Sequence, residues 1–364
     1  MTRLEQLRAF LDERGYDGFL ATVRSNQVSF VDHPDPTAVF SNTNLPYLLV
    51  TPEACVVFPG LWISNACRDL LTRCEVIPNE VGDPSVEEQV VAYVKRSGMR
   101  KVAMDALGGN VMETLRREVP GVTVTSEGEA MRAMRRKRTP EEIEMLRKTA
   151  EIGDAGLDAA FRVVRPGVTA RDVEAEGVAT MLRLGCERGL INVVSGPATY
   201  YLDSGNDCRR TIQAGEMLFM DIAISYKGYG GDQTRPAIVG EGTPAQRDLL
   251  ETVKRSFYEV RAALAPGARA QDVYAIHCRN MERKGWRKYF YHHISHGVGL
   301  GGGDAGPRID SASEDVLQEG DVISCEPGVY VPGIGGARVE DIVHVTKDGP
   351  VTLTRSAIDR VISV

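Results

Sequence analysis

The chain has 364 residues, of which 43% are hydrophobic and 26% are charged, and its formal net charge is −7. This length is sufficient for two domains with large cores, and the composition is ordinary for a globular protein. The excess of acidic residues argues against a nucleic-acid partner, because phosphate binding depends on clustered Lys and Arg. Since no apolar run reaches about 18 residues, we expect no transmembrane helix and no membrane partner.

The amino terminus and the cysteines both indicate the cellular compartment in which the protein is expected. Leu4, Leu7 and Leu11 recur at helical spacing among charged residues, which predicts an amphipathic helix and not a signal peptide. The seven cysteines are scattered without any C-x-x-C spacing. An odd, dispersed set is typical of reduced thiols. We therefore expect a cytoplasmic protein.

Residues 1–130 alternate helical patterns with short apolar runs that predict strands at 18–22, 47–50, 54–58 and 100–104. This stretch has one histidine, His33, and no paired acids. We interpret it as a separate α/β domain that shapes or covers a site built by the second domain, residues 131–364.

A helix start marks the entrance to the second domain. Thr139 fits an N-cap, Pro140 the first helical position, and Glu142 completes a capping box. The buried face of the helix that follows is expected to carry Ile143, Leu146 and Ala150. The basic run at 132–138 just before it is interpreted as a solvated linker face and not as a phosphate-binding site.

The second domain contains an internal repeat. The segment 165–175 recurs at 265–275, an offset of 100 residues, and the segment that ends at Asp221 recurs 105 residues later, ending at Glu326. Each half therefore reads as helix, Pro-Gly turn, helix and strands. We expect two helical pairs on a sheet assembled from both halves, related by a pseudo-two-fold axis.

Each half places one acid at the end of an apolar strand-like run, and a second acid follows: Asp232 after Asp221, and Glu340 after Glu326. If 217–224 and 232–239 form a hairpin, Asp221 and Asp232 are expected to lie opposite one another, about 5 Å apart at Cβ. The alternative is that these are unrelated acids at strand ends. Four carboxylates in one pocket repel unless cations lie between them, so we expect a metal site. His296, in a glycine-rich stretch, is the candidate fifth ligand.

These segments carry a family resemblance. In this order, 220–235, 295–300, 324–330 and 337–345 resemble the metal-binding motifs of the pita-bread metallopeptidases, which include methionine aminopeptidase, aminopeptidase P and prolidase. The resemblance runs from about Arg138 to the end. Residues 1–130 resemble the creatinase-type domain of prolidases and aminopeptidases P. The implied fold is α+β, with a carboxyl-terminal pita-bread fold that has an internal pseudo-two-fold repeat and follows a creatinase-like α/β domain.

The resemblance also implies a ligand set. Asp221 would bind one metal and His296 with Glu326 the other, while Asp232 and Glu340 would contact both. One imidazole among oxygen ligands suits Mn²⁺, with Zn²⁺ or Co²⁺ as alternatives. Two such ions activate water and polarise a scissile carbonyl, and by resemblance Glu326 transfers the proton.

The implied activity is hydrolysis of Xaa-Pro bonds in small peptides that have proline at the second position. We expect an Xaa-Pro dipeptidase and a homodimer; the alternatives are an Xaa-Pro aminopeptidase that acts on longer peptides and a catalytically weak metal-binding module. His292 matches a histidine that contacts substrate in the family. Arg338 lies two residues before Glu340, so we expect the two on one strand face. Arg338 either pairs with a site carboxylate or holds the carboxylate of the substrate.

Two family histidines are missing. The position seven residues after His296 is Gly303, and the segment that begins at Ser195 continues past Asp203 to Asp221 without a histidine. Either other groups replace their hydrogen bonds or catalysis is weakened. The candidate replacements are Tyr200, Tyr201, Asp203, His293 and Asp304.

Overall fold

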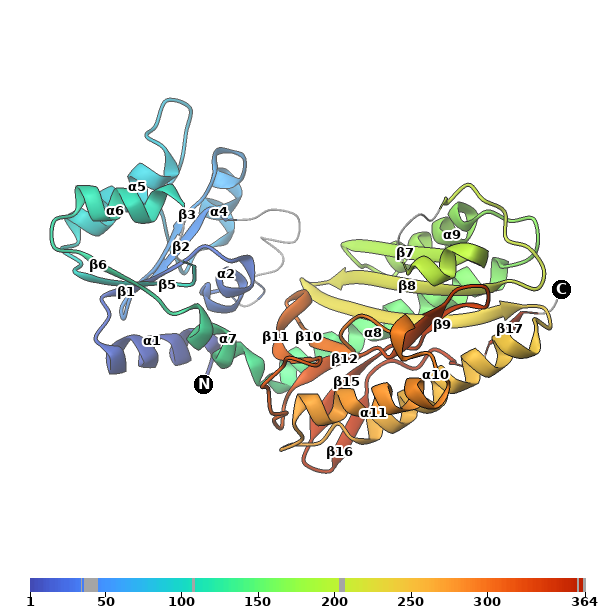
Figure 1. The fold of residues 1–364 in the computed structure, drawn as a ribbon. Helices are drawn as coiled ribbons and strands as arrows, with labels where there is room; N and C mark the ends of the chain where they lie inside the picture. The colour runs from blue at the N-terminus through green and yellow to red at the C-terminus, as the bar shows by residue number, and fades with distance from the viewer. Residues whose placement is uncertain (34, 36–44, 107–108, 203–206, 359, 363–364) are drawn as a thin grey trace. The chain divides into compact units, whose positions relative to one another are not determined.

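The computed structural model describes residues 1–33, 35, 45–106, 109–202, 207–358 and 360–362. These residues divide into two compact units, Met1–Met134 and Arg135–Val364 (Figure 1). Within the described ranges, no helix is both long and apolar enough to cross a membrane.

The first unit is built on a six-stranded mixed sheet in the order β4-β3-β2-β1-β5-β6. Its strands are β1 Gly18–Ala21, β2 Tyr47–Val50, β3 Cys55–Phe58, β4 Glu75–Val76, β5 Lys101–Met104 and β6 Thr123–Ser126. All four strands predicted from the apolar runs are present, because each run is short, β-branched or aromatic, and bounded by turn residues.

Helices supply the rest of the core of this unit. They are α1 Arg3–Arg14, α2 Arg24–Phe30, α4 Ser64–Leu70, α5 Val86–Arg96, α6 Asn110–Glu118 and α7 Gly128–Arg136, with a 3₁₀ turn η1 at Leu61–Ile63. The predicted amphipathic helix is α1, which buries Leu4, Leu7 and Leu11 and is capped by Thr2. Helices α5 and α6 pack their apolar faces against the sheet.

The second unit contains two helical pairs (Figure 1): α8 Pro140–Val163 with α9 Ala170–Arg183, and α10 Pro244–Ala262 with α11 Ala270–Arg283. The predicted capping box is formed, since the Thr139 side chain accepts from the backbone of Glu142 and the Glu142 side chain accepts from the backbone of Thr139. Leu146 and Ala150 of α8 are fully buried, as expected.

The helices pack on a sheet to which both halves contribute. Its order is β16-β15-β12-β10-β11-β9-β8-β7, and β17 also pairs with β9. The strands are β7 Arg188–Ser195, β8 Met217–Tyr226, β9 Tyr229–Val239, β10 Ser295–Gly299, β11 Gly301–Ile309, β12 Val322–Cys325, β15 Asp341–Thr346, β16 Gly349–Thr352 and β17 Val361–Ile362. A separate ribbon is formed by β13 Gly328–Val331 and β14 Gly335–Arg338. A 3₁₀ turn, η2, spans Gly196–Tyr201, and a shorter one, η3, spans Arg287–Tyr289.

The predicted repeat is present in the backbone. Gly167 and Gly267 follow the first helix of each half with φ of 91° and 87°, a conformation that favours glycine. The N–H of Gly167 donates to the carbonyl of Ile212, and that of Gly267 donates to the carbonyl of Leu317. Ile212 and Leu317 are 105 residues apart, the same offset as Asp221 and Glu326, so the two halves repeat one local structure.

The β8–β9 hairpin differs from the expected one. Its loop is only Lys227 and Gly228, with φ of 48° and 75°, and both strands run further into the turn-rich stretch than predicted. Asp221 therefore lies opposite Thr234, not opposite Asp232. The two acids share a face as diagonal neighbours, for which Cβ separations of about 7 Å are usual.

The basic run before α8 is also different from its interpretation. Arg135 and Arg138 are buried, and each forms an ion pair of 2.9 Å with buried Asp304. Arg136 pairs with Asp321 at 2.6 Å. The interpretation of the basic run as a solvated linker face is therefore wrong, because these guanidinium groups pair with carboxylates that are distant in sequence.

Candidate metal centre

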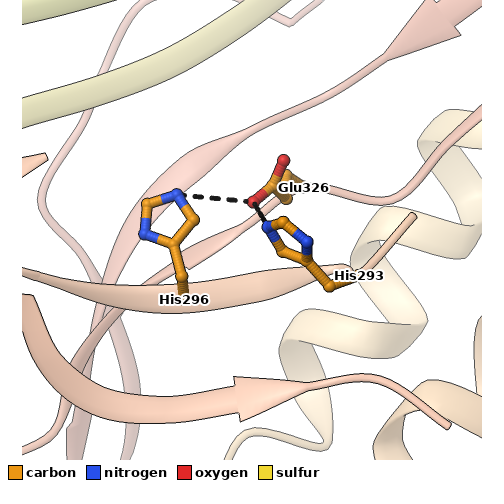
Figure 2. Close-up of side chains that lie close together, drawn as sticks. All are labelled: His293, His296 and Glu326. Atoms are coloured by element: carbon orange, nitrogen blue, oxygen red, sulfur yellow. Dashed lines mark ion pairs between the residues drawn. The ribbon is translucent and has the colours of Figure 1, made fainter. Parts of the chain in front are cut away.

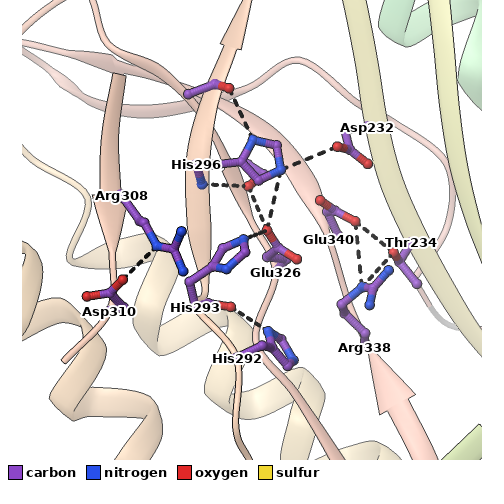
Figure 3. Close-up of polar contacts among 12 residues, drawn as sticks. Asp232, Thr234, His292, His293, His296, Arg308, Asp310, Glu326, Arg338 and Glu340 are labelled. Atoms are coloured by element: carbon purple, nitrogen blue, oxygen red, sulfur yellow. Dashed lines mark hydrogen bonds and ion pairs between the residues drawn. The ribbon is translucent and has the colours of Figure 1, made fainter. Parts of the chain in front are cut away.

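Acids from both halves of the second unit meet where β9, β10 and β12 come together (Figure 3). Asp232 lies on β9, His296 on β10, and Glu326 directly after β12. Glu340 precedes β15 and is tied to β9 by two backbone hydrogen bonds with Thr234, of 3.4 and 3.1 Å. This pairing between the halves brings carboxylates more than 100 residues apart into one cluster.

The imidazole of His296 lies at the centre of the cluster. Its Nε2 is 3.4 Å from Asp232 Oδ2 and 3.6 Å from Glu326 Oε1. Two three-residue groups have ligand atoms within 4.8 Å of one another: Asp232, His296 and Glu340, and His293, His296 and Glu326. A metal bound to nitrogen and oxygen at about 2.0–2.2 Å places neighbouring donors a little over 3 Å apart. The donor set therefore fits divalent cations.

Hydrogen bonds orient these ligands. Nδ1 of His296 donates to the Gly297 carbonyl at 3.1 Å, which leaves Nε2 to face the carboxylates. The hydroxyl of Ser324 accepts from the His296 backbone N–H and donates to Glu326 Oε1, both at 3.0 Å. No sequence pattern singled out Ser324, although it lies two residues before Glu326 and so on the same side of the chain.

The electrostatics of the cluster favour added positive charge. Burial raises the pKa of Asp232, and it raises that of Glu340 well above the usual value. Burial would lower the pKa of His296, but its hydrogen bond with Asp232 and the charge of Glu326 outweigh burial and raise that pKa to about 9. A proton on His296 thus relieves the repulsion between acids. A divalent cation would relieve it more fully.

Asp221 lies beside this cluster and is outside the two three-residue groups. Its Oδ2 accepts from Arg338 Nη2 at 2.5 Å, and its Oδ1 accepts from the Thr234 hydroxyl at 3.2 Å. Thr234 Oγ1 is also 2.7 Å from Glu340 Oε2 and accepts from Arg338 Nε at 3.0 Å. Thr234 therefore connects two of the predicted ligands, a role that no sequence motif indicated.

Arg338 and Glu340 were expected on one strand face, and this expectation is wrong. Arg338 ends β14 of the two-stranded ribbon, whereas Glu340 lies between β14 and β15. Tertiary packing still places Arg338 Nε 3.8 Å from Glu340 Oε2. The guanidinium group is buried among carboxylates, which fits the pairing role that was one of its two predicted roles.

His292 lies on the side of the cluster formed by β13. Its Nδ1 donates to the His293 carbonyl, and its Nε2 is 3.2 Å from the hydroxyl of Tyr330. Burial lowers the pKa of His292 to about 4, so its imidazole is neutral near pH 7. Arg338 Nη1 donates to the same hydroxyl at 3.5 Å. Tyr330, which no sequence pattern singled out either, thus connects His292 with Arg338.

The candidate replacements for the missing histidines lie in different places. Asp304 is buried and forms ion pairs with Arg135 and Arg138, neither of which belongs to the cluster. Tyr200 and Tyr201 share a hydroxyl–hydroxyl bond on η2, and Asp203 lies outside the described residues. Of the described candidates, His293 is the one that the structure places against a predicted ligand: its Nε2 is 3.4 Å from Glu326 Oε1 (Figure 2).

Comparisons with known proteins agree with this geometry. Residues 144–347 match metallopeptidase family M24. The chain is 32% identical to an Xaa-Pro dipeptidase of Pyrococcus furiosus over 97% of its own length and 98% of that relative. An Xaa-Pro dipeptidase structure from Bacillus anthracis matches with a TM-score of 0.86 at 26% identity, covering 100% of this chain and 99% of that one. An X-Pro aminopeptidase structure from Thermotoga maritima gives 0.87 at 21% identity over the full length of both chains, which supports the fold alone.

The fold and the partly buried cluster of acids and imidazoles define a metallopeptidase, a hydrolase that depends on divalent metal. The α+β fold class and the resemblance to the pita-bread metallopeptidases are confirmed. The chain belongs to metallopeptidase family M24.

Proposed function

We propose that this protein is an Xaa-Pro dipeptidase that holds two divalent ions with Asp221, Asp232, His296, Glu326 and Glu340. The observation that carries the proposal is the convergence of Asp232, His296, Glu326 and Glu340, which places three carboxylates around one imidazole. The full-length similarity to an Xaa-Pro dipeptidase of Pyrococcus furiosus supports the substrate class.

The ligand set is mostly oxygen, which suits Mn²⁺ and admits Zn²⁺ or Co²⁺. Bound ions of this kind supply Lewis acidity, which polarises the scissile carbonyl and lowers the pKa of water. We further propose that residues 1–130 and 131–364 are separate domains and that the protein is a cytoplasmic homodimer.

Glu326 has the properties of the proton-transfer group. Burial would raise its pKa, but the neighbouring His293 imidazole and the charge of Arg338 outweigh burial and lower that pKa to about 2. The ionised carboxylate can accept a proton from the attacking water and pass it to the leaving nitrogen. This transfer matters for an Xaa-Pro bond, because its tertiary amide nitrogen has no proton of its own.

The other two predicted catalytic residues have supporting roles in this proposal. His292, neutral and bonded to Tyr330, would form the wall that contacts the substrate. Arg338, only 7% exposed, would hold Asp221 in place, and this pairing fits its burial better than binding of the substrate carboxylate does.

The test compares hydrolysis of Ala-Pro, Met-Pro and an Xaa-Pro-Yaa tripeptide by the parent protein and by Glu326→Gln, with Mn²⁺ added. We expect both dipeptides to be cleaved, and loss of the proton-transfer group to lower kcat by about 10²- to 10⁴-fold. Glu314→Gln, which changes an exposed acid, is the matched control and should leave the rate unchanged.

Each alternative has its own outcome in this test. Rapid cleavage of only the tripeptide would favour the aminopeptidase. Binding of the added metal without cleavage of any of these peptides would favour the catalytically weak metal-binding module. Loss of an oxyanion donor lowers the rate by about 10²- to 10³-fold, so the missing histidines alone do not abolish catalysis.

A further inference from the structure

His293 is the one member of the two three-residue groups that the predicted ligand set leaves out. It comes just before β10, and its side chain is 29% exposed. Figure 2 shows the imidazoles of His293 and His296 approaching one oxygen of Glu326 from two sides. The two rings are 5.8 Å apart at their centroids.

The distances distinguish between two roles for His293. Its Nε2 is 3.4 Å from Glu326 Oε1, and His296 Nε2 is 3.6 Å from the same oxygen. An N–H···O hydrogen bond is usually about 2.9 Å long, so both distances exceed it. Donors that share one metal in tetrahedral geometry, at bonds of about 2.0–2.1 Å, lie about 3.3–3.4 Å apart. The spacing therefore fits ligands of a common cation better than it fits direct hydrogen bonds.

The backbone holds His293 in this place. The next residue, Ile294, donates its N–H to the Ile309 carbonyl and accepts from the Glu326 N–H, both at 2.9 Å. The second of these bonds joins the segment that carries His293 directly to the residue that its side chain faces. The carbonyl of His293 also accepts from His292 Nδ1. His293 and Glu326 are thus positioned relative to one another before any ligand binds.

We propose that His293 is a second imidazole ligand of the metal position formed by His296 and Glu326. This inference rests on the proposed metal centre and deepens it. Two imidazoles and one carboxylate are protein ligands that catalytic zinc sites use, and here Asp232 and Glu340 would share this ion with the second position. The two metal positions would then differ: the position with His293 would prefer Zn²⁺ or Co²⁺, and the oxygen-rich position would suit Mn²⁺.

The experiment measures metal binding directly. The metal-free parent, His293→Gln and His344→Gln are titrated with Zn²⁺ and with Mn²⁺ by calorimetry, and the visible absorption of the Co²⁺-loaded proteins is recorded. Glutamine keeps an N–H that can bond to Glu326 but removes the ring nitrogen. His344, on β15, belongs to neither three-residue group and is the matched control for loss of an imidazole.

We expect His293→Gln to weaken Zn²⁺ binding at one of two positions by at least about 10- to 100-fold, the loss usual when even an indirect partner of a metal ligand is removed. Mn²⁺ binding should change less, and the Co²⁺ absorption should change in shape and intensity. The His344→Gln protein should behave as the parent does. His293→Ala is the second variant and should reproduce the loss.

The results separate this inference from the proposed function. If the parent binds two metals and cleaves Xaa-Pro peptides, but His293→Gln and His293→Ala keep its Zn²⁺ affinity and its Co²⁺ spectrum, the ligand role is overturned alone. If both variants lose Zn²⁺ and Mn²⁺ affinity equally, the proposed difference between the two positions is wrong. A parent that binds no divalent metal would overturn the inference and the proposed function together.

Discussion

Protonation of His277 is expected to destabilise the second unit in mild acid. His277, on α11, is fully buried. Its Nε2 donates to the Gly328 carbonyl at 3.0 Å, and its Nδ1 is 2.7 Å from the hydroxyl of Ser256. A carbonyl can only accept, so the neutral ring satisfies both bonds when Ser256 donates to Nδ1. A second proton on the ring would force that hydroxyl to turn away.

The pKa values give the size of the effect. Burial lowers the pKa of His277 to about 3, whereas its ordinary value is 6.5. The unfolded chain therefore binds the proton first, and the stability that is complete above pH 6.5 is lost as the pH falls toward 3. Each pH unit in that window costs about 1.4 kcal/mol, so the free energy of unfolding should fall by about 2 kcal/mol between pH 7 and pH 5.

The assay is urea unfolding at pH 7 and pH 5 in the presence of a chelator, so that metal binding does not change with pH. The chain has two tryptophans, and Trp62, in the first unit, is 96% exposed. In a Trp62→Phe background, the fluorescence of Trp286 reports on the second unit alone. His277→Gln keeps a donor for the Gly328 carbonyl but does not titrate in this range.

The comparison between proteins isolates His277, because the other titrating groups are common to both. The parent should lose about 2 kcal/mol more than His277→Gln between the two pH values. If the two losses agree within about 0.5 kcal/mol, the usual limit of additivity, the buried neutral imidazole is not the cause and the reasoning is refuted.

Three further predictions concern the metal centre and its surroundings. Thr234→Val should lower the free energy of unfolding, measured in urea, by about 1–3 kcal/mol, since it removes the acceptor of Arg338 Nε. Thr234→Ser keeps the hydroxyl and should retain the stability of the parent. Equal losses in both variants would contradict this role. Addition of Mn²⁺ at about 100 times its Kd should raise the free energy of unfolding by about 2.7 kcal/mol, seen as a higher Tm in calorimetry; a Tm that does not respond to Mn²⁺ would argue against binding to the folded state. Asp304→Asn should lower the free energy of unfolding by about 3–5 kcal/mol, because two buried guanidinium groups share this carboxylate. Asp310→Asn, in a more exposed ion pair, should lower it by less than about 1 kcal/mol. Similar losses in the two variants would show that burial does not decide the difference.

Much of the architecture was predictable because its signals are local. The capping box at Thr139 requires only residues within one helical turn, and the helix begins where that box predicts. The recurrence of 165–175 at 265–275 indicated two halves, and the glycines at 167 and 267 have nearly equal backbone angles. The kinds of ligand atom were also predictable, since repeated acids and one imidazole after apolar runs indicate oxygen and nitrogen donors for a metal.

The placement of side chains between distant segments was not predictable in the same way. The two-residue turn at Lys227 and Gly228 set the register of β8 and β9, so that Asp221 faces Thr234. Burial of Arg138 depends on Asp304, which lies 166 residues later in the chain. Such pairs leave no local pattern, because a charge has the same appearance in sequence whether solvent or a carboxylate neutralises it.

For this protein the sequence by itself determined the repeat, the helix starts, most strand positions and the kinds of atom available to a metal. Only the tertiary structure decided which of those atoms meet. Backbone pairing between the halves brings Glu340 to Thr234, and the bond between Ile294 and Glu326 brings His293 to the cluster. The physical reason is that ligand geometry depends on strand register and long-range backbone hydrogen bonds, and a shift of one residue would turn each of these side chains to the other face.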